Sequence, residues 1–288
     1  MPVTTATLDV PGAAVTYDVH APTESPGAPQ RPLFIIGSPM GAQGFTTLVG
    51  HFPDRTVVTY DPPGMNRSTV AEHAHPDPMS RGAALHAIAQ AVGQGPYDLF
   101  ASSGGAVDGL AWIQQFPDDV ATAVLHEPPL APVLPDGDVV AAVMDDIHHT
   151  YEAHGFGAGM AKFFAVSMAQ GEIPADFLDR PAPDPAQFGL PTQDDGRRGD
   201  PLLGINMRTM QHWVPALAAV RAARTRVVPA YGEDSGEGMA ARAARALAAE
   251  LDVEAAPFPG DHSGFSGGEY GPAGKPEQFA ATLRALLG

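Results

Sequence analysis

The sequence predicts an α/β protein with a mostly parallel central sheet and helices on both of its faces. Residues 33–36 form a continuous apolar run, which is typical of a central strand buried on both faces. Residues 55–60 and 120–126 also have the composition of buried strands, and residues 80–93 between them show helical spacing of apolar side chains. Strands that alternate with helices in this way favour a mostly parallel sheet.

Composition limits the class of protein. The 288 residues include 44% hydrophobic and 17% charged residues, which is typical of a globular chain, and no apolar run reaches the length of a membrane span. The formal net charge of −17 offers no basic surface to nucleic acid or to an anionic membrane, so a neutral small-molecule substrate is expected. Because there is no cysteine, disulfides and thiol chemistry are excluded. The start of the chain lacks a leader pattern, and a cytoplasmic location is expected.

The two ends of the chain extend the predicted sheet. Residues 4–10 and 13–20 alternate apolar and polar residues around a Pro-Gly pair, which predicts an antiparallel hairpin at a sheet edge. Further elements are predicted toward the C-terminus: strands over residues 226–231 and 253–258, and helices over residues 239–251 and 276–287. In the loop DPPGMNRS after residues 55–60, Asp61, Gly64 and Ser68 are expected to hold the shape of the loop.

The pattern changes between residues 131 and 222. Helical spacing predicts helices over residues 138–154, 158–169, 202–213 and 215–224, with a proline-rich loop in the middle. The predicted organisation is a core made of residues 1–130 and 223–288, with residues 131–222 inserted as a helical lid. Some large apolar side chains of the lid are candidates to line a substrate pocket, although such a stripe also suits ordinary core packing. They are Met160, Phe163, Phe164, Met168, Met207, Met210 and Trp213.

The segment YDLFASSGGAV, residues 97–107, carries the main functional signal. A short buried strand leads into a turn of small residues, and a helix follows. A nucleophile at such a strained turn needs small residues two places before and after it, because these approach neighbouring backbone closely. Ser103 has an alanine and a glycine at those places, whereas Ser102 would have Phe100 behind it. Ser103 is therefore the candidate nucleophile, and a plain Gly/Ser turn is the alternative.

Other segments offer partners for this serine. The turn GSP follows residues 33–36, where a backbone NH can face the oxyanion of a tetrahedral intermediate. Because the proline has no NH, Ser38 or Met40 would supply one donor, and Gly104 would supply the other. Of the eleven histidines, His262 alone follows a late strand in a glycine-flanked loop, and it is the candidate base.

Taken together, the order of elements, the serine turn, the helical insertion and the late histidine resemble the α/β-hydrolase superfamily over essentially the whole chain. The resemblance implies the α/β-hydrolase fold. Three segments, YDPPGMNRS, SSGGA and HEPP, are similar to those of the zearalenone lactonases, which open a resorcylic macrolactone with a Ser-His-Glu triad. This similarity implies the triad Ser103, His262 and Glu127, and Trp213 weakly resembles a lid tryptophan that packs on the substrate.

Two carboxylates compete for the role of the triad acid. Glu127 stands at the carboxyl end of strand 120–126, where prolines stop the strand and where open α/β sheets place their sites. Asp234 follows the penultimate strand, where the superfamily usually keeps its acid in a G-x-x-D pattern, but it lies one residue early. The sequence favours Glu127, with Asp234 as the alternative.

These assignments predict a serine hydrolase that cleaves an ester or lactone of a neutral, fairly hydrophobic small molecule through an acyl-enzyme, without a cofactor. A non-hydrolytic tailoring enzyme such as a cyclase, or a ligand-binding protein of the same fold, is the alternative. No metal is expected, because His73, His75 and Asp77 lie in a proline-rich loop without a further ligand. The sequence does not specify the oligomeric state, and a homodimer is compatible with it.

Overall fold

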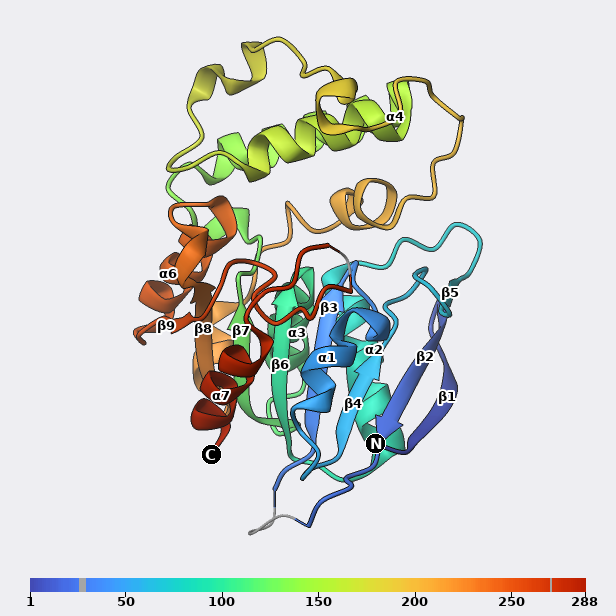
Figure 1. Cartoon of the computed structure of the whole chain (residues 1–288), viewed down its shortest axis with the longest axis vertical. Coiled ribbons are helices and arrows are strands. Elements are labelled where there is room, and N and C mark those ends of the chain that lie inside the picture. Colours follow the sequence, from blue (N-terminus) through green and yellow to red (C-terminus); the bar gives the residue numbers. More distant parts are fainter. Residues whose placement is uncertain (26–29, 270) are drawn as a thin grey trace.

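The computed structural model describes residues 1–25, 30–269 and 271–288. In these ranges a nine-stranded sheet has the order β1-β2-β4-β3-β6-β7-β8-β9, with β5 beside β2 (Figure 1). β1 (Val3–Val10) and β2 (Ala13–His20) form the predicted antiparallel hairpin, and β2 pairs antiparallel with β4 (Val57–Tyr60). The pairs from β4 to β9 are parallel. The prediction of a mostly parallel sheet is confirmed.

Six further strands complete the sheet. They are β3 (Leu33–Ser38), β5 (Thr69–Val70), β6 (Tyr97–Ser103), β7 (Val120–His126), β8 (Arg226–Gly232) and β9 (Ala256–Phe258). Successive side chains of a strand point to opposite faces. In β3, Phe34 and Ile36 therefore join one hydrophobic cluster, whereas Leu33 and Ile35 join another. The continuous apolar run arises because this strand contributes to two cores.

Helices cover both faces of the sheet (Figure 1). One core contains side chains of α2 (Pro78–Val92), α3 (Gly104–Gln115), α5 (Leu217–Ala222) and α6 (Met239–Leu251). The other core contains side chains of α1 (Thr46–Gly50) and α7 (Pro276–Leu287). In the amphipathic α6, the buried residues include Ala244, Leu247 and Leu251, which recur at helical spacing.

The helical region lies at one end of the sheet, with α4 (Gly137–Ser167) running across it (Figure 1). The two helices expected over residues 138–154 and 158–169 form one run that breaks at Gly155. This glycine has φ = 83°, and a Cβ here would lie 2.3 Å from Asp194 Oδ1. The region also contains two 3₁₀ turns, Ala175–Asp179 and Pro185–Phe188, in the proline-rich loop.

The helix expected over residues 202–213 does not form. A π-helical turn, Pro201–Ile205, and a 3₁₀ turn, Asn206–Arg208, stand in its place. The Asp200 carboxylate accepts from the NH groups of Leu202 and Leu203 at 3.0 and 2.8 Å, which starts the first turn. Glycine, asparagine and threonine within this stretch are weak helix formers, so the helix has little propensity to continue. The expected strand 253–258 is shorter, Ala256–Phe258, and β5 was not expected.

A buried ion pair joins α2 to α3. Arg81 and Asp108 are both fully buried, and Arg81 Nε donates to Asp108 Oδ1 at 2.8 Å. Burial raises the pKa of Asp108 to about 6, against the opposing effect of Arg81. Since an unpaired buried charge is far costlier than a buried pair, each side chain depends on the other.

Arg81→Met is expected to lower the free energy of unfolding by about 3–5 kcal/mol, because it leaves the Asp108 carboxyl buried without its partner. Urea denaturation of the variant measures the loss. In the matched double variant Arg81→Met, Asp108→Leu, most of the stability should return. If Arg81→Met were as stable as the wild type, the ion pair would not be needed for stability.

Candidate active site

Ser103 lies at a sharp turn between β6 and α3. Its backbone has φ = 57° and ψ = −132°, a conformation that non-glycine residues rarely adopt. The neighbouring glycines are required by space, since a Cβ on Gly104 would lie 2.5 Å from the carbonyl oxygen of Ser38. A Cβ on Gly105 would lie 2.6 Å from Gly37 Cα. The turn therefore has the tight geometry that its small residues predict.

The two neighbouring serines face different surroundings. Ser103 lines a cavity at the carboxyl edge of the sheet, whereas Ser102 is buried and its Oγ lies 3.3 Å from His126 Nδ1. The His126 ring packs among aromatic side chains such as Phe279, and burial lowers its pKa to about 4. Among the described residues the Ser103 hydroxyl makes no hydrogen bond, and Ser103 borders the cavity.

Glu127 and His262 form a hydrogen-bonded pair in the same cavity. His262 Nδ1 donates to Glu127 Oε2 at 2.6 Å, which leaves Nε2 to act as a proton acceptor. The other oxygen of the Glu127 carboxylate accepts from the NH of Gly232 at 2.8 Å, and Glu127 is 1% exposed. Burial alone would raise the pKa of Glu127, but the hydrogen bond and charge of His262 lower it to about 2. A charged carboxylate thus fixes the orientation of the imidazole.

Asp234 does not contact His262 in this way. It lies in the 3₁₀ turn Glu233–Ser235 after β8 and accepts from Lys275 Nζ at 2.6 Å in an exposed ion pair. Glu127, in contrast, follows the end of β7, and its backbone NH donates to the carbonyl of Ala230 in the neighbouring strand β8. Of the two carboxylates, the structure brings Glu127 to the histidine.

The cavity has a volume of about 470 Å³. Ser38 and Gly104 line it together with Ser103 and His262, whereas Met40 lines a neighbouring cavity. Four of the expected lid side chains form part of its wall: Phe163, Phe164, Met207 and Met210. Met160 and Trp213, which pack against the hydrophobic core, are not among its lining residues, and neither is Met168, which is 62% exposed. The candidates Met160, Met168 and Trp213 therefore lie outside this wall, since helical spacing identifies a face but not what the face contacts.

Sequence patterns missed several wall residues. Val140 and Met144 of α4 and Met239 of α6 belong to the apolar wall, and the buried Asn206 adds an amide. The only signal for Asn206 is its position as a lone amide between Ile205 and Met207 in an otherwise apolar stretch.

Comparisons with known proteins agree with this architecture. No model of a known protein family matches the chain. An uncharacterized hydrolase of Bacillus subtilis, YraK, is 27% identical over 277 residues, which are 92% of this chain and 92% of the relative. An α/β-hydrolase from Sphaerobacter thermophilus superposes with a TM-score of 0.62 at 17% identity, covering 98% of this chain and 100% of that one.

The chain has the α/β-hydrolase fold. Two esterases share it. A putative aryl esterase from Burkholderia cenocepacia has a TM-score of 0.64 at 16% identity, covering 98% of this chain and 97% of that one. A thermophilic esterase from Thermogutta terrifontis has a TM-score of 0.66 at 13% identity, covering 100% and 98%.

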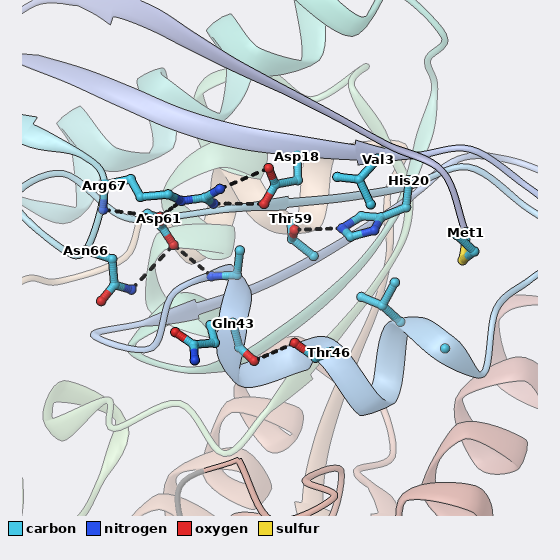
Figure 2. Close-up of a pocket in the computed structure, with 13 residues that line it drawn as sticks. Met1, Val3, Asp18, His20, Gln43, Thr46, Thr59, Asp61, Asn66 and Arg67 are labelled. Atoms are coloured by element: carbon cyan, nitrogen blue, oxygen red, sulfur yellow. Dashed lines mark hydrogen bonds and ion pairs between the residues drawn. The ribbon is translucent and has the colours of Figure 1, made fainter.

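A second cavity of this α/β-hydrolase fold, also of about 470 Å³, lies beside β1, β2 and α1 (Figure 2). Its charged side chains bind one another: the Arg67 guanidinium donates to Asp18 at 2.8 Å and to Asp61. Asp61 also accepts from the NH of Ala42 at 2.9 Å, and Ser68 Oγ donates to the Asp61 carbonyl at 2.7 Å. These contacts hold the loop DPPGMNRS in shape, which agrees with the expectation for Asp61 and Ser68.

Within residues 1–25, 30–269 and 271–288, no three His, Asp or Glu side chains are arranged to hold a metal ion. In the loop that carries His73 and His75, Asp77 instead caps α2 by accepting from the NH of Ser80 at 2.8 Å. Nor does any helix in these ranges have the length and apolarity to cross a membrane.

Proposed function

We propose that the protein is a serine hydrolase that cleaves a carboxylic ester or lactone of a neutral, fairly hydrophobic small molecule. The observation that carries the proposal is that Ser103, on its strained turn, and the hydrogen-bonded Glu127–His262 pair line one cavity. A nucleophile, a base and an oriented carboxylate are the three parts of a serine-hydrolase triad. YraK is named a hydrolase and the two neighbours of this fold are named esterases, one of them putative, which supports the same class of reaction.

The reaction would follow from the roles of these side chains. His262 Nε2 takes the proton of Ser103 as the hydroxyl oxygen attacks the carbonyl carbon, and Glu127 stabilises the imidazolium that forms. The NH groups of Ser38 and Gly104 donate to the oxyanion. The intermediate collapses as His262 returns the proton to the leaving alcohol, and a water activated by His262 then hydrolyses the acyl-enzyme.

The cavity wall indicates the kind of substrate. Around the reacting serine it is largely apolar, with methionine and phenylalanine side chains from α4 and from residues 201–210. Methionine adapts to irregular shapes, so a bulky apolar body would be accommodated. We assign to residues 131–222 the role of a lid that selects the substrate. The position of Glu127 after β7, where it hydrogen-bonds His262, supports the resemblance to the lactonases.

A panel of neutral aryl esters, small lactones and macrolactones tests the proposal. Turnover of at least one class, with kcat/KM rising with the apolar size of the substrate, is expected because larger substrates contact more of the wall. A fluorophosphonate probe is applied in parallel. If the probe labels Ser103 while no substrate of the panel is hydrolysed, the protein is a binding or cyclase-like member of the fold instead.

A further inference from the structure

The segment Pro201–Met210 reaches from the helical region to the serine turn. Asn206 is 2% exposed and Ser38 is 1% exposed, and the two side chains face each other. Asn206 Nδ2 donates to Ser38 Oγ at 3.0 Å, and the hydroxyl can in turn donate to Asn206 Oδ1 at 3.3 Å. A polar pair this deeply buried is stable only because each group satisfies the other.

The same segment covers the second proposed donor. A Cβ built on Gly104 would lie 2.9 Å from Met210 Cε, so the thioether packs directly on the backbone of Gly104. Met210 is itself buried, and both Asn206 and Met210 line the cavity. One segment of ten residues thus contacts both of the residues proposed to donate to the oxyanion, Ser38 and Gly104.

The segment is held in place at several points. Tyr151 Oη of α4 accepts from the NH of Asp200 at 2.9 Å, and His148 Nδ1 donates to the carbonyl of Leu203 at 2.7 Å. Thr209 Oγ1 donates to the carbonyl of Pro76, in the loop before α2, at 3.0 Å. The bonds from Tyr151 and His148 fix the backbone that leads to Asn206, whereas the Thr209 bond anchors the far end of the segment.

We propose that Asn206 is a positioning residue, which holds Ser38 so that its backbone NH points at the developing oxyanion. The inference rests on the proposed hydrolase function. Stabilisation of an oxyanion depends on donors placed 2.7–3.1 Å from the charge that develops, so a small shift of Ser38 weakens the transition state more than the bound substrate. Ser103, His262 and Glu127 remain the reacting groups.

Asn206→Ala should lower kcat for a neutral p-nitrophenyl ester by about 10- to 100-fold, less than the loss of a whole donor, with KM changed by less than about threefold. Ser38→Ala, which keeps the backbone NH but removes the hydroxyl, should give a similar loss. Because the two side chains act through one contact, the double variant should be no slower than the slower single variant by more than about twofold.

Thr209→Val is the matched control, because it removes a hydrogen bond of the same segment that is made to Pro76 and not to Ser38. It should keep kcat within about threefold of the wild type even if the midpoint of thermal unfolding falls. The inference would be overturned if Thr209→Val lowered kcat as much as Asn206→Ala does, or if Asn206→Ala left kcat unchanged. It would also be overturned if the losses of kcat in Asn206→Ala and Ser38→Ala multiplied in the double variant. If Asn206→Ala does not fold, Ser38→Ala tests the same contact from its other side, at the end of β3.

The rate at which a neutral fluorophosphonate modifies Ser103 separates this inference from the proposed function. If the wild type hydrolyses no ester but reacts with the phosphonate, the hydrolase proposal fails, and the ratio of wild-type to Asn206→Ala labelling rates still decides the role of Asn206. A ratio of about ten or more supports it, and a ratio near one overturns it. If the wild type does neither, both proposals are wrong.

Discussion

Ser103→Ala is expected to lower kcat for a neutral activated ester by about 10⁴-fold or more, because the variant has no hydroxyl to form the acyl-enzyme. The backbone at this position is fixed by the tight packing of Gly104 and Gly105, so the fold should remain intact. Steady-state kinetics measure the loss of activity, and thermal unfolding verifies that the variant is folded.

Ser102→Ala is the matched control for this experiment. The Ser102 hydroxyl lies 3.3 Å from Nδ1 of the buried His126, and Ser102 does not line the cavity, so its removal should cost stability on the order of 1 kcal/mol and keep kcat within about tenfold. An inactive Ser102→Ala beside an active Ser103→Ala would mean that the nucleophile has been assigned to the wrong serine.

Glu127→Gln is expected to lower kcat by about 10⁴-fold. The Gly232 NH holds one side-chain oxygen in place, so the amide nitrogen of the glutamine would face His262 Nδ1. That nitrogen donates rather than accepts, which forces the imidazole into the tautomer whose Nε2 already carries a proton. In this tautomer His262 cannot take the proton of Ser103. Kinetics at neutral pH on the same ester measure the effect.

Asp234→Asn tests the alternative acid. Its carboxylate binds Lys275 in an exposed ion pair, and exposed pairs contribute little to stability. Activity should stay within about tenfold of the wild type, a loss of about 1.4 kcal/mol or less in transition-state stabilisation. If Asp234→Asn were the inactive variant, the acid would belong after β8, and the resemblance to the lactonases would lose its main support.

The central strands and the serine turn could be predicted because their signals are local. The apolar run of β3 and the small residues around Ser103 follow from what those positions must fit. The choice between Glu127 and Asp234 depended on distance across the sheet, which the sequence does not contain. In the structure β7 lies beside β8, which places the Glu127 carboxylate against the Gly232 NH and within hydrogen-bonding distance of His262.

The helical region was harder to predict for a physical reason. Apolar spacing over residues 202–213 resembles a helix, but an Asp200 cap, Gly204 and tertiary contacts from Tyr151 and Pro76 favour two short turns instead. Trp213 shows the same limit, because a large apolar side chain packs equally well into a core or a cavity wall. Contacts between distant segments decide both cases.

The backbone of both Ser103 and Glu127 has consequences for the tolerance of the protein to heat. These residues have φ values of 57° and 49°, in the region that favours glycine, and each such position costs about 1–3 kcal/mol. They stand at the ends of neighbouring strands, β6 and β7, so two of the five non-glycine residues with positive φ among the described residues are proposed reacting groups. Selection for thermostability alone would tend to relax these turns and sacrifice turnover. Stabilising substitutions should therefore be sought on surfaces away from them, such as the β1–β2 hairpin or α7.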